Sequence, residues 1–308
     1  MQLVRNLTRL HGLPHGCALT IGNFDGLHRG HQAMIERLCQ RATELAVPAV
    51  LMTFDPMPLE LFCPDQAPAQ LSSLREKIED ARTFGVDIFV RVPFNRAFAA
   101  LDAQTFMQDL LVAKLNVRYV IVGEDFHFSR HQEGDVTSLR EFADRQGFEV
   151  VAMPAVAVAG GRVSSTRIRQ ALAGGDVALA RRLLGRDYRI SGRVIRGQQL
   201  GRTLGFPTVN LRMCRRVAPQ YGVYAVRVLL ADGSEQQGAA SLGVRPTVSG
   251  NDCLLEVFLL DFERDLYGQR ISVFFVDFIR PEIRFDSLTA MTRQMHEDVA
   301  AVRATLDS

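Results

Sequence analysis

The pattern of apolar residues changes once along the 308 residues of this chain, near residue 185. Before that point, short β-branched runs alternate with segments of helical spacing; beyond it, strand-like runs follow one another across polar turns. The alternation predicts a parallel sheet with crossover helices, whereas consecutive strands predict an antiparallel barrel or sandwich. The chain is therefore predicted to hold two domains of different class, residues 1–185 and residues 186–308.

The first domain is predicted to be a doubly wound α/β fold with a parallel sheet. Ser73 and Asp102 stand where helix N-caps are expected. Because ligands bind at the carboxyl ends of strands in such sheets, the loops after Gly22, Phe54 and Gly123 are the first candidate sites. The expected strands are 18–22, 49–54, 87–92, 118–123 and 148–153, and the expected helices are 31–46, 74–84, 103–114 and 136–146.

The second domain follows a helical stretch at 164–184. A polar turn at 231–234 separates two of its strands, and a closing helix is expected from Ser287 to Leu306. Either Asp286 or Ser287 is suited to cap that helix. The expected strands are 188–195, 221–230, 236–243, 253–261 and 271–279.

The composition excludes several classes of protein. With 47% hydrophobic and 23% charged residues, the chain is globular and not disordered or fibrous. No run approaches the roughly 20 apolar residues of a membrane span, and the start lacks a signal peptide, so a cytoplasmic location is expected. Five cysteines, odd in number and never spaced as CxxC, suit neither a disulfide framework nor a zinc site.

The positive charge is unusual in its makeup. Of 36 basic residues only Lys77 and Lys114 are lysines, which leaves 34 arginines. Neither lysine stands in a GxxxxGK[ST] pattern, so a P-loop is excluded and phosphate binding needs another device. A net charge of +2, together with the lack of an aromatic RNA-stacking motif, disfavours nucleic-acid binding.

The strongest local signal is the segment Gly22–His31, which reads GNFDGLHRGH after the first strand. Its glycines allow close approach of a nucleotide, and a helix starting near His28 directs its amino terminus at phosphate. His28 and His31 are the candidate catalytic residues, as donors to charge that develops on transferred phosphate. The alternative is that one histidine is a helix cap and the other a packed surface residue. The candidate nucleotide-binding residues of this segment are Gly22, Asn23, Phe24, Asp25 and Gly30.

A second motif, RVSSTRIR at 162–169, lies where another helix begins. Ser164, Ser165 and Thr166 offer three hydroxyls, and Arg167 offers a guanidinium fork that suits the β- and γ-phosphates and leaving pyrophosphate. On its own the motif is also explained as a helix cap with solvated arginines. Its combination with HxGH favours the phosphate-binding role.

A glycine-rich stretch, 192–210, ends in Pro-Thr-Val-Asn. The Thr208 hydroxyl and the Asn210 amide oxygen are hard ligands suited to Mg²⁺ bound with phosphates. A structural hairpin is the alternative. The candidate nucleotide-binding residues here are Gly192, Gly197, Arg202, Pro207 and Thr208.

The first two motifs, in this order, resemble the nucleotidylyltransferase superfamily and in particular the FMN adenylyltransferase module of bacterial bifunctional riboflavin kinase/FMN adenylyltransferases. Segments 53–58 (TFDPMP), 122–129 (VGEDFHFS) and 133–135 (EGD) resemble further segments of that module, with Met57, Ser129 and Glu133 as departures. The resemblance implies flavin-binding roles for Asp55, Asp125, Phe126 and Phe128.

The stretch ending in PTVN resembles the signature of riboflavin kinases. Segments 221–225, 243–247 and 255–262 agree with it, and Phe258 is a departure. The resemblance implies a six-stranded antiparallel barrel with a C-terminal helix, Glu256 as catalytic base, and Arg280 and Glu282 near the flavin. Without the family, Glu256 also reads as a solvent-facing strand glutamate.

The resemblance runs from about Ala18 to about Ala301 and implies an enzyme with two activities. The barrel is expected to phosphorylate riboflavin with MgATP, and the first domain to join FMN to AMP from a second ATP, releasing pyrophosphate. Riboflavin, FMN, FAD and ATP are the expected partners, with self-association left open and no nucleic acid or membrane. The alternatives are an inactive domain, giving a monofunctional transferase or a flavin sensor, and a nucleotidylyltransferase acting on a pantetheine or glycerol phosphate.

Overall fold

The computed structural model describes residues 1–9, 13–197, 204–213, 217–247 and 250–307. The chain divides into two compact units. The first unit holds Met1–Pro68 and Ser73–Val163, and the second unit holds Ala69–Ser72 and Ser164–Ser308. The two helices that precede the barrel thus belong to the second unit. The boundary predicted at residues 185/186 separates the two activities, and it stays a prediction.

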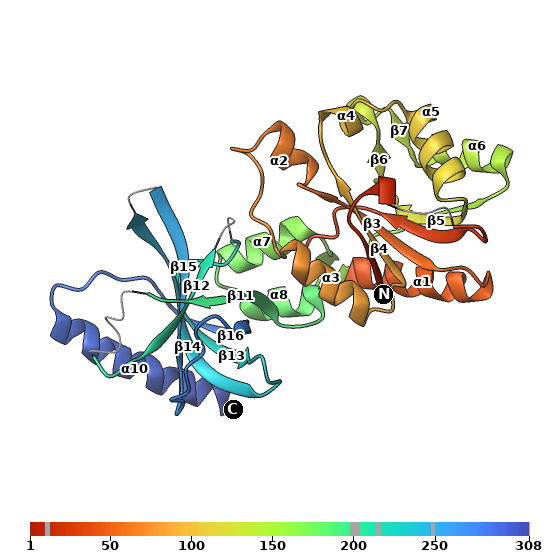
Figure 1. Ribbon diagram of the computed structural model, residues 1–308. Coiled ribbons are helices and arrows are strands. Elements are labelled where there is room, and N and C mark those ends of the chain that lie inside the picture. The colour runs from red at the N-terminus through yellow and green to blue at the C-terminus, as the bar shows by residue number, and fades with distance from the viewer. Residues whose placement is uncertain (10–12, 198–203, 214–216, 248–249, 308) are drawn as a thin grey trace. The chain divides into compact units, whose positions relative to one another are not determined.

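A six-stranded parallel sheet forms the centre of the first unit (Figure 1). The strand order is β1-β4-β3-β2-β5-β8, so β2 lies beside both β3 and β5, at the point where the order of connection reverses. Such a switch point opens a crevice at the carboxyl ends of the strands. The doubly wound fold is confirmed. The strands are β1 (Gln2–Val4), β2 (Cys17–Ile21), β3 (Ala49–Asp55), β4 (Ile88–Pro93), β5 (Val117–Gly123) and β8 (Glu149–Met153).

Helices cover both faces of this sheet. On one face α1 and α3 pack through Ile35, Leu38 and Ala81, and on the other the π-helix η2 and α6 pack through Leu111 and Leu139. The described helical elements of this unit are η1 (Leu7–Arg9), α1 (Arg29–Glu44), α2 (Pro58–Phe62), α3 (Leu74–Thr83), α4 (Arg96–Ala99), α5 (Ala103–Thr105), η2 (Phe106–Lys114), η3 (Arg130–Gln132) and α6 (Val136–Gln146). Two short hairpins pair β6 (His127–Phe128) with β7 (Gly134–Asp135) and β9 (Ala157–Val158) with β10 (Gly161–Arg162).

The predicted N-caps are confirmed. Ser73 accepts a hydrogen bond from the Glu76 amide in a capping box, and Asp102 accepts one from the Thr105 amide. Ser287, and not Asp286, caps the closing helix by accepting from the Ala290 amide. These contacts satisfy backbone donors that a helix start leaves unpaired.

Several elements differ from the prediction. The strand β1 and helices α2 and α4 were not expected, because three to five residues are too few to show a period. The expected helix 103–114 is split into α5 and the wider-wound η2. The expected helical stretch 164–184 is two helices, α7 (Ser165–Ala173) and α8 (Val177–Leu184), interrupted at Gly175, whose φ is +75°.

The second unit is built around a closed antiparallel barrel with the order β11-β12-β15-β14-β13-β16. Its closing helix α10 (Leu288–Leu306) lies along the barrel (Figure 1). It packs on the barrel in a cluster that includes Val302, Ala225 and Leu260. The sixth strand, β12, lies in the glycine-rich stretch 192–210, where the apolar pattern did not predict a separate strand. The strands are β11 (Tyr188–Ile195), β12 (Thr208–Met213), β13 (Gly222–Leu229), β14 (Glu235–Thr247), β15 (Gly250–Leu259) and β16 (Arg270–Pro281).

Candidate active sites

The loop after β2 is folded tightly by apolar side chains that point inward. Phe24 and Leu27 have positive φ angles of 45° and 36°, and both are buried with 1% and 0% exposure. Gly26 has a φ of 83°. Positive φ is costly for residues other than glycine, so packing of the two apolar side chains must hold this turn in place. The loop is thus a preformed bend beside the switch point of the sheet, and it leads from a strand into a helix, as the sequence predicted for Gly22–His31.

His28 and His31 stack on one another at the start of α1. Their ring centroids lie 3.7 Å apart with an interplanar angle of 12°. His28 is the N-cap, and its Nδ1 accepts a hydrogen bond from the His31 amide at 3.3 Å. Because Nδ1 accepts, the neutral His28 ring carries its proton on Nε2 and can donate from there. His28 can therefore cap the helix through Nδ1 and donate a hydrogen bond through Nε2.

Gly30 and Phe24 shape the surroundings of the two rings. A side chain at Gly30 would place its Cβ 3.3 Å from the His28 ring, so glycine leaves room for the stack. The Phe24 ring meets His31 edge-on at 5.1 Å. Asp25 of the same loop is 2% exposed. Both histidines are thus held by neighbours from the predicted motif.

The carbonyl of Asn23 receives two hydrogen bonds that the motif does not reveal. The Thr53 hydroxyl donates to it at 3.2 Å, and the Lys77 ammonium donates to it at 2.9 Å. Lys77 is 4% exposed and lies on α3, just after the capping box of Ser73. A charge-assisted bond of this kind is about twice as strong as a neutral one. Lys77 therefore supports the loop, and nothing in the sequence around it signals this role.

Aromatic rings line the carboxyl ends of β3, β4 and β5. Phe126 and Phe128, predicted from the family resemblance, stack at 5.6 Å and 19°. Phe128 then contacts Phe106, and the contacts continue through Phe98 to Phe54, Phe94 and Phe62. We call these seven rings the aromatic row. Its end at Phe62 is 59% exposed, next to the exposed Leu59 of α2.

The two aspartates predicted near the flavin each have an arginine partner. Arg91 donates to Asp55 at 2.7 Å, and Arg162 donates to Asp125 at 2.6 Å. Asp55 and Arg91 are about one-third exposed, whereas Asp125 is 63% exposed. Neither pairing was predicted from the sequence, although Arg162 begins the motif at 162–169, because each arginine is far from its aspartate along the chain. The pairs fix the direction of each carboxylate at the sheet edge.

Two departures from the family pattern occupy special positions. Ser129 has a φ of +68°, a conformation that favours the glycine expected there, and its buried hydroxyl has no hydrogen-bond partner among the described residues. Met57 is 6% exposed and caps α2, and its amide donates to the Glu60 carboxylate at 2.8 Å. Both substitutions are therefore accommodated within the folded first unit.

The motif at 164–167 forms the first turn of α7, in the second unit. The Ser164 hydroxyl caps the helix by accepting from the Arg167 amide at 3.2 Å. Ser165, Thr166 and Arg167 follow in the first turn, where backbone N–H groups and the positive end of the helix dipole favour an anion. Ser164 is thus a helix cap, as the alternative explanation held. The cap does not account for the side chains of Ser165, Thr166 and Arg167.

In the barrel, Asn210 and Glu256 are directly opposite each other on β12 and β15. Side chains of a directly opposed pair lie on the same face of a sheet. Thr208, two residues before Asn210, shares that face and is opposite Phe258. The strand register therefore brings the predicted ligands Thr208 and Asn210 to the same face as the predicted base Glu256. Asn210 and Glu256 are 46 residues apart along the chain.

The Asn210 side chain is positioned from a third strand. A Cβ at Gly197, just beyond β11, would lie 2.6 Å from the Asn210 Nδ2, so only glycine fits there. Asn210 is 3% exposed, and its Oδ1 is buried and accepts no hydrogen bond from any described residue. A buried oxygen without a donor is the arrangement expected where a cation completes the site. Thr208 and Asn210 thus fit Mg²⁺.

Phe206 anchors the turn that leads through Pro207 into Thr208. Its ring contacts Phe258 at 5.2 Å and His296 of α10 at 4.9 Å. The closing helix therefore supports the start of β12. Gly192 on β11 packs against Leu211, where an added Cβ would lie 3.3 Å from its side chain. Arg202, predicted to bind nucleotide, lies outside the described residues.

Arg280 and Glu282, predicted near the flavin, have different surroundings. Arg280 forms a two-pronged ion pair with Asp298 of α10, with distances of 2.7 and 2.6 Å, and both side chains are mostly buried. The Glu282 carboxylate lies over Gly243, where a Cβ would meet its Oε1 at 2.7 Å. Arg280 thus holds the closing helix against β16, and Glu282 lies above the backbone of β14.

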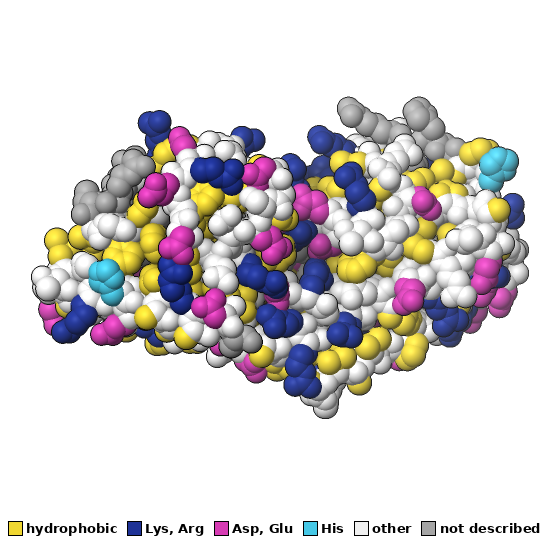
Figure 2. All heavy atoms as spheres, turned by 90° about the horizontal axis from the view of Figure 1, so that it is seen from below, with side chains coloured by type: hydrophobic (Ala, Val, Ile, Leu, Met, Phe, Trp, Pro, Cys, Tyr) yellow, Lys and Arg dark blue, Asp and Glu magenta, His cyan; other side chains and the backbone are white. Residues whose placement is uncertain are grey.

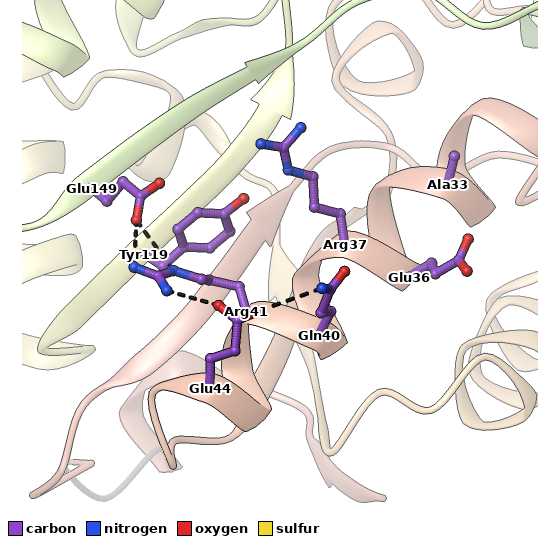
Figure 3. A pocket seen from close by; sticks show the side chains of 8 residues that line it. All are labelled: Ala33, Glu36, Arg37, Gln40, Arg41, Glu44, Tyr119 and Glu149. Carbon is purple, nitrogen blue, oxygen red and sulfur yellow. Dashed lines mark hydrogen bonds and ion pairs between the residues drawn. The ribbon is translucent and has the colours of Figure 1, made fainter.

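A polar hollow of about 700 Å³ lies beside α1, away from the predicted residues (Figure 3). Arg41 donates to both Glu44 and Glu149 across it, so its charges are largely paired. Burial raises the pKa of Tyr119 on its floor. The lining residues are Ala33, Glu36, Arg37, Gln40, Arg41, Glu44, Tyr119 and Glu149. None of the candidate site residues lines this hollow.

Among the described residues, no three His, Cys, Asp or Glu side chains are grouped to hold a metal ion. The face drawn in Figure 2 intersperses Lys and Arg with Asp and Glu. Within the described ranges, no helix is both long and apolar enough to cross a membrane.

Comparison with protein families matches both parts of the chain. The FAD synthetase family matches residues 11–167, which include the histidine loop, and the riboflavin kinase family matches residues 184–306, which include the Asn210–Glu256 pair. The chain belongs to the bifunctional riboflavin kinase/FMN adenylyltransferase family. The family read from the motifs is confirmed.

Members of this family resemble the chain over nearly its full length. Identity is 46% to the enzyme of that name from Escherichia coli K12, over 98% of this chain and 97% of the relative. It is 48% to the one from Pseudomonas fluorescens (99% and 97%) and 44% to the one from Haemophilus influenzae (100% of both). A crystal structure described as a macrolide-efflux protein from Streptococcus pneumoniae has 30% identity and a TM-score of 0.84, covering 98% of this chain and 99% of that one. That description concerns the other protein, and the motifs of this chain follow the flavin family.

Proposed function

We propose that this chain catalyses two successive transfers from ATP, first phosphorylating riboflavin to FMN in the barrel and then joining FMN to AMP to give FAD and pyrophosphate. The observation that carries the proposal is that two separate groups of candidate residues, the stacked histidines in the first unit and the Asn210–Glu256 pair in the second, are each held by the fold of the unit in which they lie. The bifunctional relatives support both halves of the proposal.

In the adenylyl transfer, a phosphate oxygen of FMN attacks the α-phosphorus of ATP. The bond from that phosphorus to the bridging oxygen breaks, and pyrophosphate leaves with the electron pair. Negative charge grows on the equatorial oxygens during this step, and preorganised donors stabilise it. We assign this role to the His28 Nε2–H, to His31 and to the amino terminus of α1. No covalent enzyme intermediate is required, so positioning carries much of the rate.

Nucleotide binding in this reaction is assigned to the loop after β2 and to the start of α7. Gly22, Asn23, Phe24, Asp25 and Gly30 border the preformed bend where the nucleotide approaches the backbone. The hydroxyls and guanidinium of the α7 motif suit the β- and γ-phosphates, which leave as pyrophosphate. The residues of that motif are Ser164, Ser165, Thr166 and Arg167.

Flavin binding in the first unit is assigned to the aromatic row and the two aspartates. The partly exposed Phe126 ring, stacked on the buried Phe128, offers a surface for the apolar, planar isoalloxazine ring. Asp55 and Asp125, oriented by Arg91 and Arg162, offer carboxylate acceptors for ribityl hydroxyls.

In the kinase reaction, Glu256 is assigned as general base. Its carboxylate accepts the proton of the terminal ribityl hydroxyl as that oxygen attacks the γ-phosphorus of ATP, and ADP leaves. Thr208 and Asn210 would hold Mg²⁺, whose charge would balance that of the phosphates. Arg280 supports the flavin side by fixing α10, and Glu282 borders it. Gly192, Gly197, Arg202 and Pro207 complete the assigned nucleotide-binding set.

The cellular setting is part of the proposal. We place the enzyme in the cytoplasm, where thiols stay reduced, because the four described cysteines are all unpaired. Nucleic-acid binding is not part of the proposed function, given the low net charge of +2.

An HPLC time course of the purified protein tests this function. One reaction starts from riboflavin, ATP and Mg²⁺, and a parallel one starts from FMN. We expect FMN to precede FAD in the first and FAD to form in the second. FMN that never becomes FAD would mean that Met57 and Ser129 have silenced the adenylyltransferase, and absence of product from both would favour a flavin sensor. Omission of Mg²⁺ is expected to stop FMN formation.

A further inference from the structure

Thr208, the assigned Mg²⁺ ligand that begins β12, has a described strand partner on one side only. It lies opposite Phe258 of β15. Among the described residues, β11 pairs with β12 further along, at Asn210 and Leu211. Strand pairing therefore fixes Thr208 from one direction, and the turn ahead of it, at Phe206, decides its place from the other.

That turn is anchored by the ring of Phe206, which is 5% exposed. The ring meets Phe258 at 5.2 Å and 69°, and it meets His296 of α10 at 4.9 Å and 67°. Both contacts are edge-to-face, a favoured geometry for aromatic pairs. His296 is itself exposed, so its contact lies at the surface of the second unit. Phe206 is thus held between a strand of the barrel and the closing helix.

The helix that carries His296 is fixed by contacts of its own. Asp298 accepts two hydrogen bonds from Arg280 of β16, at 2.7 and 2.6 Å, and a third from Gln294 at 3.1 Å. The side chains of the ion pair are 19% and 8% exposed. Val302, further along α10, is fully buried. These contacts hold α10 on the barrel, so the His296 ring meets Phe206 from a fixed support.

We propose that His296 is a positioning residue for phosphate transfer in the barrel. It acts through Phe206, which it holds in the turn that places Thr208 at the site assigned to Mg²⁺ and the phosphates of ATP. The inference rests on the proposed kinase role of Thr208. It adds to that role a residue of the closing helix, which lies outside the motif that ends in Pro-Thr-Val-Asn.

The test is His296→Ala, with Glu297→Ala as matched control, since both residues are exposed and neighbours on α10. Loss of the ring contact is expected to raise the KM for MgATP in riboflavin phosphorylation about fivefold. The KM for riboflavin is expected to stay within about twofold of wild type. FAD formation from FMN, measured in the same preparations, should also stay within about twofold.

A second readout needs neither metal nor substrate. Hydrogen exchange of the β12 amides, followed by mass spectrometry of the free protein, is expected to be about fivefold faster in His296→Ala, because the start of the strand opens more often. His296→Phe keeps a ring at the same place. It is expected to restore both the slow exchange and the wild-type KM for MgATP, which a mere loss of the imidazole chemistry would not allow.

The proposal is overturned if His296→Ala matches Glu297→Ala in both readouts, if the KM for riboflavin rises as much as that for MgATP, or if His296→Phe restores neither readout. Thr208→Ala serves as reference. If it leaves the KM for MgATP unchanged, the assigned role of Thr208 fails, and the positioning role fails with it. If it raises that KM while His296→Ala does not, only the positioning role fails.

Discussion

The histidine loop and the barrel pair are built in different ways. The loop places His28 and His31 within four residues of each other, at a turn and a helix start that local sequence defines. The barrel pair brings Asn210 and Glu256 together through strand register, across 46 residues. A site made by local geometry leaves a compact motif in the sequence, whereas a site made by register has its members scattered.

The two regions also differ in where their support comes from. The loop is supported from β3 and α3, through Thr53 and Lys77, whereas the barrel pair is supported from β11 through the space at Gly197. Thr53 and Lys77 lie outside the histidine motif that they support, whereas Gly197 belongs to the same glycine-rich stretch, 192–210, as Asn210. Substitutions at these supports show how far each site depends on distant parts of its unit.

Asn210→Ala is expected to have the largest effect among the support and ligand substitutions. Loss of the buried Oδ1 removes an assigned Mg²⁺ ligand, and riboflavin phosphorylation should fall by about 100-fold or more. The rate of FAD formation from FMN is the control and should be unchanged. Steady-state kinetics of both reactions check this. If the variant phosphorylated riboflavin at the wild-type rate, the Asn210–Glu256 pair would not be the kinase site.

Lys77→Met is expected to slow FAD formation by about tenfold or more. The change leaves the Asn23 carbonyl without its charged donor, and loss of such a bond costs about 1.5–3 kcal/mol. Lys114→Met, the substitution of the other lysine, is the matched control and should be close to wild type. Rates measured from FMN and ATP decide between them. Equal behaviour of the two variants would show that the loop keeps its shape without support from α3.

Gly197→Ala is expected to lower riboflavin phosphorylation by about tenfold. The added methyl would overlap the Asn210 side chain and move its amide, at a cost of about 1–3 kcal/mol. Gly233→Ala, in an open barrel turn where a Cβ meets nothing within 4 Å, is the control. If both variants phosphorylated riboflavin at the same rate, the segment after β11 would not position Asn210.

The last prediction concerns the pH dependence of thiol alkylation at Cys253, which lies three residues before Glu256 on β15. It tests the packing of β15 and involves no loss of activity. Burial raises the pKa of this thiol to about 11, so about one molecule in a thousand is ionised at pH 8. Alkylation of Cys253 by iodoacetamide, followed by peptide mass spectrometry, is expected to accelerate about tenfold per pH unit up to about pH 11. A plateau near pH 8.5 would show an ordinary exposed thiol and a looser β15 than the structure has.

Much of the fold was predictable because period and caps are local properties. The helix Val136–Gln146 and the strand Tyr188–Ile195 have the predicted bounds, and Ser73 and Asp102 cap as expected. The break at Gly175 was missed because glycine inside an apolar helical pattern is ambiguous.

In the candidate sites, too, only contacts between residues close in the sequence could be predicted. The stack of His28 on His31 follows from their spacing at a helix start. The roles of Lys77, Arg91 and Asp298 did not follow, because each acts on a residue from another element. The sequence also offered no means to see that α7 packs with the barrel, since its motif matches the FAD synthetase family up to residue 167.

The most direct test of two separate sites compares His28→Ala with Glu256→Ala in HPLC time courses started from riboflavin and from FMN. His28→Ala should convert riboflavin to FMN and stop there, with FAD formation reduced by about 100-fold or more. Glu256→Ala should leave riboflavin unchanged, with a loss of about 100-fold or more, and still convert FMN to FAD. Loss of both steps in either folded variant would contradict the assignment of one reaction to each constellation.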